Sequence, residues 1–151
     1  MAHSYTNLLV HVLFSTKNRE KKLNAEIRKN LFPYLAAVLN SQGSKVLIVG
    51  GGLEHVHILL RIRPDQNIAA LTRVAKTNSS RMIREKFDQG FRWQRSYAAL
   101  SVSESQRQCV YEYIANQEGH HKRVDFDSEY VSLLKRNEIR FDLERLWKSE
   151  N

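Results

Sequence analysis

The sequence contains few of the residues that cross-link a chain or interrupt it. It has a single cysteine, Cys109, so no disulfide can form within the chain. We expect a reducing compartment in which this thiol is buried as a small hydrophobe. Only two residues are proline, and no repeat, low-complexity tract or Pro/Ser-rich linker is present. We therefore expect one domain over residues 1–151, because two domains of this combined length would be cramped.

Long apolar runs are also missing. No run approaches the roughly 20 apolar residues that span a bilayer, and the opening MAHSYTN has no basic segment followed by an apolar one. We expect a cytoplasmic protein with no membrane partner. Acidic residues are scarce: 16 Asp and Glu against 24 Lys and Arg give a formal charge of +8. This balance favours a polyanionic partner, and nucleic acid suits it best because no long amphipathic lipid-binding segment is present.

Strand-like and helix-like spacings of apolar residues alternate along the chain. Apolar residues at alternate positions, β-branched runs and one aromatic-rich stretch predict strands over residues 7–16, 44–49, 53–62 and 91–102. Helical spacing predicts helices over residues 24–40, 68–87 and 104–119, followed by two shorter ones over 127–136 and 141–147. The order β-α-β-β-α-β-α predicts an α+β fold: a ferredoxin-like (RRM-like) antiparallel sheet with helices packed on it and a C-terminal helical extension.

Individual residues predict where these elements begin, bend and end. Asn24 is suited to cap the first helix, and Pro33 is expected to kink or split it. The three glycines at 50–52 allow a turn that would pair the second and third strands as a hairpin. Ser103, with Gln106 three residues later, predicts a capping box at the start of the helix over 104–119.

Two histidines lie on one face of the predicted strand over 53–62. Val56 and Ile58 belong to its apolar face, so His55 and His57 project side by side from the opposite face. Two neighbouring imidazoles can bind one divalent ion. Taken alone, this pair is weak evidence, and two surface or semi-buried histidines on an amphipathic strand are the alternative.

The helix over 104–119 carries a tyrosine and a glutamine one turn apart. Tyr113 and Gln117 share a face with Val110 and Ile114. The Tyr113 phenol is a nucleophile once deprotonated, and the Gln117 amide oxygen is an acceptable ligand for a hard divalent ion. The alternative is a tyrosine that only packs in the core. Tyr111 is a weaker candidate nucleophile, because it points about 200° around the helix from Tyr113.

Basic residues cluster after the first strand and along the middle helix. Such clusters suit contacts with phosphates, and a tryptophan between arginines could stack on an unpaired base. The predicted DNA contacts are Lys17, Arg19, Arg73, Lys76, Arg81, Arg84 and Trp93. Solvated basic faces and a core tryptophan are the alternatives.

The histidine strand and the tyrosine helix together resemble the single-tyrosine HUH transposases of the insertion-sequence-200/605 type. The resemblance rests on Glu54-His55-Val56-His57 and on Tyr113-Ile114-Ala115-Asn116-Gln117. Further matching segments are Phe14-Ser15-Thr16-Lys17, Trp93-Gln94, Ser101-Val102-Ser103, Gln117-Glu118-Gly119-His120-His121 and Phe126. The chain departs from the family at Glu54, where aspartate is commoner, and at Ser96-Tyr97-Ala98-Ala99, where a turn richer in glycine is usual. We expect neither departure to touch a catalytic group.

The resemblance implies metal-assisted transesterification of single-stranded DNA. Mg²⁺ or Mn²⁺ would be held by His55, His57 and Gln117, and Tyr113 would form a 5′-phosphotyrosine. It also implies a prokaryotic, nucleoid-associated homodimer that recognises hairpins at the ends of its element, with Tyr113 acting in trans.

Other functions remain open on the sequence. A non-catalytic module that binds single-stranded nucleic acid, such as a domesticated relative, would explain the charge. A metal-dependent phosphodiesterase would use the histidines without covalent catalysis. Relaxases share the chemistry but tend to be longer.

Overall fold

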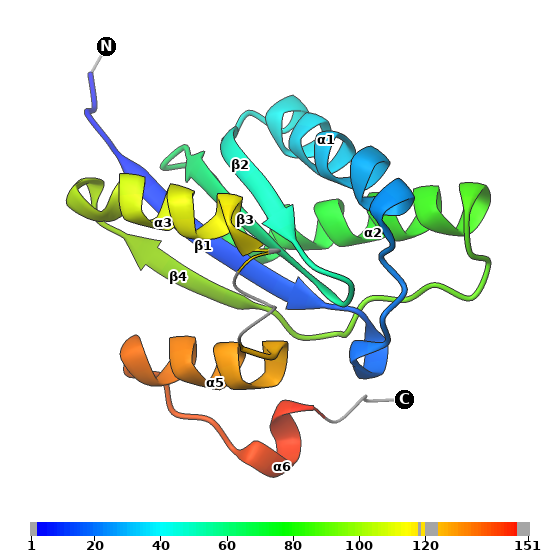
Figure 1. The fold of residues 1–151 in the computed structure, drawn as a ribbon. Helices are drawn as coiled ribbons and strands as arrows, with labels where there is room; N and C mark the ends of the chain where they lie inside the picture. The colour runs from blue at the N-terminus through cyan, green and yellow to red at the C-terminus, as the bar shows by residue number, and fades with distance from the viewer. Residues whose placement is uncertain (1–2, 118, 120–123, 148–151) are drawn as a thin grey trace.

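The computed structural model describes residues 3–117, 119 and 124–147. Its elements follow the predicted order (Figure 1). They are β1 (Leu8–Ser15), α1 (Ala25–Ser41), β2 (Lys45–Gly51), β3 (His55–Ile62), α2 (Ile68–Lys86), β4 (Ala98–Val102), α3 (Arg107–Ala115), α5 (Phe126–Arg136) and α6 (Leu143–Leu146). Short 3-10 turns precede α1 and α3. No helix among these elements is both long and apolar enough to cross a membrane.

The four strands form one antiparallel sheet in the order β2-β3-β1-β4. This order confirms the predicted ferredoxin-like α+β fold, in which the first and third strands lie at the centre. The register pairs Phe14 with Val56 and Leu13 with His57. Directly opposed residues point to the same side of a sheet, so the apolar face of β1 continues onto β3, and the histidines of β3 share a face with Leu13.

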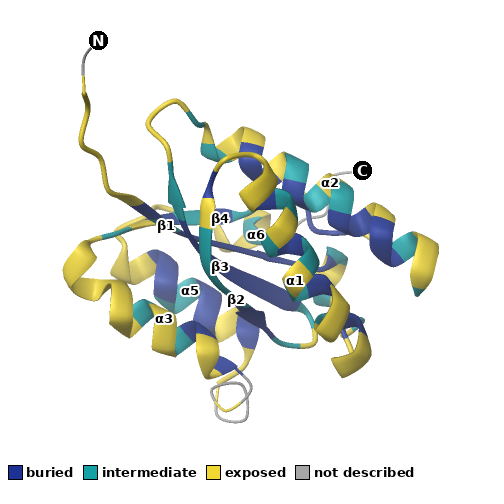
Figure 2. Cartoon of the chain, turned by 90° about the horizontal axis from the view of Figure 1, so that it is seen from above, coloured by how far each residue is buried: buried dark blue, intermediate teal, exposed yellow. Residues whose placement is uncertain are grey.

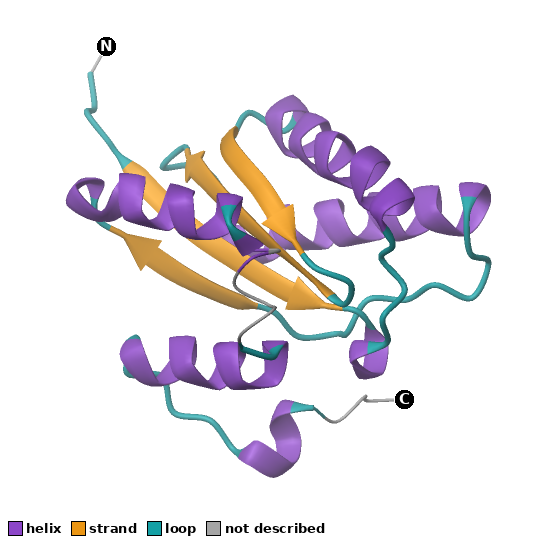
Figure 3. Cartoon of the chain, viewed as in Figure 1, coloured by secondary structure: helices purple, strands orange, loops and turns teal. Residues whose placement is uncertain are grey.

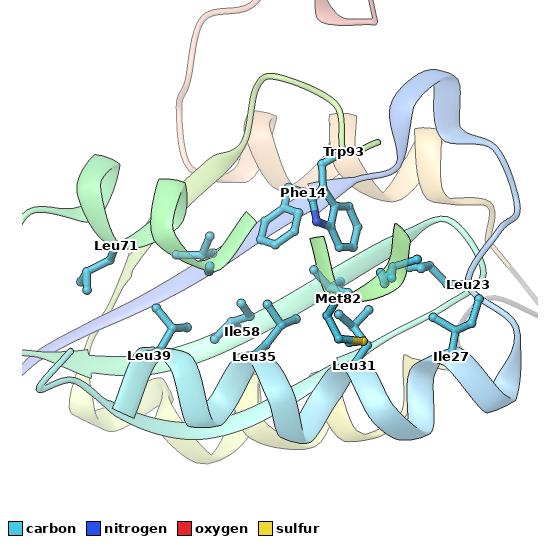
Figure 4. Packing of buried hydrophobic residues seen from close by; sticks show 14 of the residues in the cluster. Phe14, Leu23, Ile27, Leu31, Leu35, Leu39, Ile58, Leu71, Met82 and Trp93 are labelled. Atoms are coloured by element: carbon cyan, nitrogen blue, oxygen red, sulfur yellow. The ribbon is translucent and has the colours of Figure 1, made fainter. Parts of the chain in front are cut away.

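Helices α1 and α2 cover one face of the sheet and enclose the main core (Figures 3 and 4). Leu31 and Leu35 of α1 are fully buried and belong to one cluster with Phe14 and Ile58 of the sheet. Asn24 caps α1 as predicted, since its side-chain oxygen accepts a hydrogen bond from the Ile27 amide.

Helices α3 and α5 cover the other face, on which the histidines lie. Phe126 and Leu133 of α5 pack against Leu13 and Leu100 of the sheet. Helix α5 has a buried inner side and an exposed outer side, whereas α3 is mostly exposed and buries only Ile114 within its bounds (Figure 2). The sheet therefore separates two clusters of buried side chains, and the histidines lie on the side of the second cluster.

Two local predictions were wrong, and the predicted split of helix α1 does not occur. Helix α1 runs unbroken through Pro33, which lies on its exposed side. The carbonyl that loses its helical hydrogen bond, that of Lys29, also lies on an exposed residue, within reach of water. Ser103 does not form a capping box: its hydroxyl contacts that of Ser105, and a 3-10 turn leads into α3. Cys109 is exposed on α3 rather than buried.

Candidate metal centre and tyrosine site

His55 and His57 lie side by side on the covered face of β3. Both side chains are 0% exposed, and their rings are 5.1 Å apart at a near-perpendicular angle. Alternation along β3 places them there, while Val56 and Ile58 point into the core beneath α1 and α2. The histidine pair therefore faces α3 and α5 and is shielded from bulk water.

Each imidazole is oriented through its Nδ1 atom. Nδ1 of His55 lies 2.6 Å from Oε1 of Glu54, and Nδ1 of His57 lies 2.8 Å from Nε2 of His11. With the ring proton on Nδ1, each Nε2 atom is directed into the site with its lone pair available. The expectation that Glu54 touches no catalytic group was wrong, because its carboxylate orients His55.

The ring of Phe126 lies against His55. The two ring centroids are 4.3 Å apart and the planes are nearly parallel. Helix α5 thus helps to hold His55 in place from the side opposite the strand.

His11 remains neutral under physiological conditions. Burial, together with the neighbouring His57, lowers the pKa of His11 to about 3. A neutral imidazole can accept a hydrogen bond from the Nδ1–H group of His57, so His11 orients the ring of His57.

The tyrosine helix approaches the sheet closely at Gly50. A Cβ at this position would lie 2.5 Å from the carbonyl oxygen of Ile114 and 2.9 Å from its side chain. Because Gly50 pairs with His57 in the hairpin, α3 docks beside the histidines. The close approach brings Tyr113 and Gln117 to the same site, as their predicted shared face requires.

Gln117 contacts the histidine pair through its amide oxygen. Oε1 lies 3.0 Å from Nε2 of His55, while Nε2 of the amide lies near the Tyr113 carbonyl oxygen, at 3.3 Å, and near Glu129, at 3.4 Å. This orientation turns the oxygen, which is the ligand atom that the sequence predicted, toward the imidazoles.

Tyr113 lies beside the histidines of its own chain. Its ring centroid is 5.6 Å from that of His57, and its hydroxyl donates a short hydrogen bond to Oε2 of Glu129. Burial, followed by this hydrogen bond and the charge of Glu129, raises the pKa of the Tyr113 phenol. The resting phenol is therefore protonated.

Glu129 is the site residue that the sequence analysis missed. It lies on α5, is 2% exposed, and places Oε1 3.2 Å from Nε2 of His57 and 3.8 Å from Nε2 of His55. One sequence signal was available. Glu129 follows Phe126 by three residues and precedes Leu133 by four, so this acid interrupts the apolar face of an amphipathic helix.

The assembled donors fit a divalent ion. Ligand atoms of His55, His57 and Glu129 all lie within 4.8 Å of one another, and Oε1 of Gln117 adjoins them. Donor atoms bound about 2.1 Å from a six-coordinate ion lie about 3 Å from their neighbours. The separations of 3.0 to 3.8 Å described above are close to this spacing.

A basic groove runs along α2 on the other side of the sheet. It has a volume of about 630 Å³ and lies between α2 and the segment that precedes β4. Its basic residues are Lys17, Arg73, Lys76, Arg84, Arg92 and Arg95. Four of the predicted DNA contacts are among them.

Trp93 does not offer a stacking platform, contrary to the prediction. The residue is only 8% exposed, and its ring meets that of Phe14 edge to face (Figure 4). It also meets Phe91 edge to face, and its Nε1–H donates to the hydroxyl of Ser79. The indole belongs to the main core and forms the floor of the groove.

Lys76 anchors the loop beside it. Its ammonium group donates to the backbone carbonyl oxygens of Gln94, Arg95 and Ser96. Burial lowers the pKa of Lys76 to about 8, so the group is still mostly charged at neutral pH. These contacts give Lys76 a structural role at the groove.

Two other predicted DNA contacts lie outside the groove. Arg19 forms an ion pair with Asp127, at 2.8 Å, and lies over the ring of Trp147, which ties the chain after β1 to the C-terminal helices. Arg81 is exposed on α2 but does not line the groove. His120 and His121 lie outside the described residues.

Comparisons with known proteins agree with this architecture. The family described as "Transposase IS200 like" matches residues 4–117. The chain is 30% identical over 114 residues to the ISDra2 transposase TnpA of Deinococcus radiodurans, covering 71% of this chain and 81% of that protein. It is 26% identical over 124 residues to the transposase for insertion sequence element IS200 of Salmonella typhimurium, covering 78% and 81% of the two chains.

Two solved structures have a similar fold. A crystal structure of a candidate transposase from Deinococcus radiodurans superposes with a TM-score of 0.63 at 27% identity, covering 78% of this chain and 96% of that one. A REP-associated tyrosine transposase bound to a REP hairpin superposes with a TM-score of 0.62 at 13% identity, covering 100% of this chain and 96% of that one.

Proposed function

Because the chain belongs to the IS200-like transposases, a family of single-tyrosine HUH endonucleases, we propose that it cleaves and rejoins single-stranded DNA through a phosphotyrosine on Tyr113. The observation that carries this proposal is the position of the half-buried Tyr113 phenol beside the buried side chains of His55, His57 and Gln117. Covalent phosphoryl transfer needs a nucleophile beside groups that can neutralise the charge on phosphate.

The proposed cofactor is Mg²⁺ or Mn²⁺, held by His55, His57 and Gln117. When bound, the ion supplies positive charge beside the scissile phosphate. The protein's own contribution is orientation: Glu54 and His11 fix the two imidazoles, and the position of α3 brings the amide oxygen of Gln117 to His55.

Tyr113 gives up its proton to the Glu129 carboxylate that accepts its hydrogen bond, and its oxygen attacks phosphorus in line. A bond from this oxygen to phosphorus forms as the bond to the 3′ oxygen of the DNA breaks. One DNA end stays on Tyr113 as a 5′-phosphate, and the other leaves as a 3′-hydroxyl after taking up a proton. A second 3′-hydroxyl can reverse the exchange and join new ends without ATP, because the phosphotyrosine keeps the bond energy.

The proposed substrate is single-stranded DNA whose element ends fold into hairpins. The basic groove along α2 would bind phosphates of that DNA, since clustered arginines give affinity and position more than sequence readout. A protein of the same fold bound to a REP hairpin supports this assignment.

We further propose a homodimer in which each tyrosine serves its own chain. The contact between the Tyr113 hydroxyl and Glu129 of the same chain supports this arrangement, and the trans arrangement that the resemblance implied is the alternative. Mixing Tyr113→Phe protein with His55→Ala protein should restore no cleavage, even when labelled subunits are seen to exchange. Restored cleavage would favour the trans site.

A cleavage assay on end-labelled DNA tests the proposed function. Single strands from the flanks of the protein's own gene would be incubated with protein and Mn²⁺, Mg²⁺ or chelator. We expect a metal-dependent, SDS-resistant complex that contains the DNA 3′ of the cut and is lost in Tyr113→Phe. Binding without cleavage would favour a binding module, and cleavage without a complex would favour a phosphodiesterase.

A further inference from the structure

Glu129 contacts two functionally different groups through its two carboxylate oxygens. Oε1 faces the Nε2 atoms of His57 and His55, at 3.2 and 3.8 Å. Oε2 accepts the hydrogen bond of the Tyr113 hydroxyl and lies 3.4 Å from the amide nitrogen of Gln117. One side chain thus touches the histidine pair, the nucleophile and the remaining predicted ligand.

The helix that carries Glu129 follows the stretch that the family model matches. That match ends at residue 117, and α5 begins at Phe126. The position of α5 is determined by packing of Phe126 and Leu133 on the sheet and by the ion pair between Arg19 and Asp127. The carboxylate is therefore delivered by a helix docked on the sheet, and not by the histidine strand or the tyrosine helix.

Oε1 of Glu129 has the chemistry and the position of a metal ligand. Carboxylate oxygens and imidazole nitrogens are both common ligands of divalent ions in proteins. Oε1 lies 3.2 and 3.8 Å from the Nε2 atoms of His57 and His55, close to the spacing of donor atoms around one ion.

We propose that Glu129 joins the metal centre to the nucleophile, with Oε1 as a metal ligand and Oε2 as the acceptor that positions the Tyr113 hydroxyl. The inference rests on the proposed function for the presence of a metal ion. It adds a carboxylate from α5 to the ligand set of His55, His57 and Gln117. Two imidazoles with a carboxylate suit Mn²⁺ better than Mg²⁺, because imidazole is a poor ligand for Mg²⁺.

Mn²⁺ binding measured on the full chain tests the ligand role without relying on activity. Free Mn²⁺ would be titrated by electron paramagnetic resonance with wild type, Glu129→Gln and Glu85→Gln. Glu85 is the matched control, since it is an exposed acid on α2, on the other face of the sheet. We expect Glu129→Gln to weaken Mn²⁺ binding by at least about tenfold and Glu85→Gln to leave it within about twofold.

Wild-type Mn²⁺ affinity in Glu129→Gln would overturn the ligand role. The His55→Ala variant separates this failure from that of the proposed function. Loss of Mn²⁺ binding in His55→Ala alone would leave the metal-dependent transposase intact without Glu129, whereas no effect in either variant would reject the metal site itself.

The anomalous signal of Mn²⁺ in crystals of the full-length protein gives an answer that does not depend on any variant folding. An ion within about 2.4 Å of Oε1 supports the proposal. An ion on the imidazoles with Glu129 out of contact overturns it.

The positioning role has its own readout. At saturating Mn²⁺, Glu129→Gln should form the covalent complex more slowly than wild type, while Tyr113→Phe should bind Mn²⁺ with wild-type affinity. A wild-type rate for Glu129→Gln at saturating Mn²⁺ would overturn the link to Tyr113.

Discussion

Nε2 of His11 and Nδ1 of His57 lie 2.8 Å apart in the buried layer between the sheet and the helices that cover it. This contact joins β1 to β3, because Leu13 is the direct partner of His57 and His11 lies diagonally across from it on the same face. It selects Nε2 as the ligand atom of His57, and it requires His11 to stay neutral.

Acid should therefore destabilise the protein partly through His11. The folded-state pKa of His11 is about 3 and its unfolded value is about 6.5. Above pH 6.5 both states are neutral, whereas between pH 6.5 and 3 only the unfolded chain takes up the proton. The free energy of unfolding should fall as the pH drops through this window, by up to about 1.4 kcal/mol per unit for this group.

Urea unfolding at a series of pH values measures this effect. His11→Asn should flatten the decline, and His3→Asn, at an exposed position, should leave it unchanged. Equal slopes for wild type and His11→Asn would show that His11 does not contribute.

Gly50→Ala should displace the tyrosine helix. The added Cβ would meet the Ile114 carbonyl at 2.5 Å, and backbone on both sides leaves little room to adjust. We expect a loss of about 1–3 kcal/mol in the free energy of unfolding and a large loss of covalent complex, because Tyr113 moves with α3. Gly119→Ala is the control, since nothing lies within 4 Å of a Cβ there. Normal complex formation by Gly50→Ala would reject the close approach.

Arginines of the groove should account for part of the salt dependence of DNA binding. Arg73→Ala and Arg84→Ala each remove a guanidinium group from the groove. Each phosphate contact that is lost should lower the slope of log K against log salt by roughly 0.7 for single-stranded DNA. Filter binding over a salt series measures the slope. Lys29→Ala, on the exposed side of α1, should leave the slope unchanged. A slope as steep in both arginine variants as in wild type would show that the DNA does not bind in this groove.

Lys76→Met should lower the stability of the protein, because Lys76 holds the loop at residues 94–96. The ammonium group holds three successive carbonyl oxygens at residues 94–96, and these lose their donor in the variant. We expect a decrease of about 1–3 kcal/mol in the free energy of unfolding. Arg81→Met, an exposed change on the same helix, should stay within about 0.5 kcal/mol. Unchanged stability of Lys76→Met would leave Lys76 as a phosphate contact only.

Local sequence patterns predicted the histidine pair and the tyrosine–glutamine pair, but not the tertiary contacts that bring the two pairs together. Alternation on β3 placed His55 and His57 together, and helical spacing placed Tyr113 with Gln117. The two pairs meet because Gly50 leaves room for α3 against the sheet. The sequence does not show this role of Gly50, because the contact forms only in the folded protein. Glu129 lies 72 positions after His57, and only the docking of α5 brings the two together.

The sequence neighbours of basic residues were a weaker guide to the DNA contacts. Arg92 and Arg95 near Trp93 suggested an exposed ring, but the arginines line the groove while the indole packs in the core beneath it. Arg19 likewise has the charge of a phosphate ligand, yet the C-terminal helices supply Asp127 as its partner.

The most direct test of the central claim is to identify the amino acid that becomes attached to DNA. The covalent complex would be digested with nuclease and protease, and the modified peptide would be sequenced by fragmentation mass spectrometry. We predict a 5′-linked nucleotide on Tyr113, with none on the exposed neighbour Tyr111. A nucleotide on Tyr111 or on any other residue, or cleaved DNA with no modified peptide, would contradict the account.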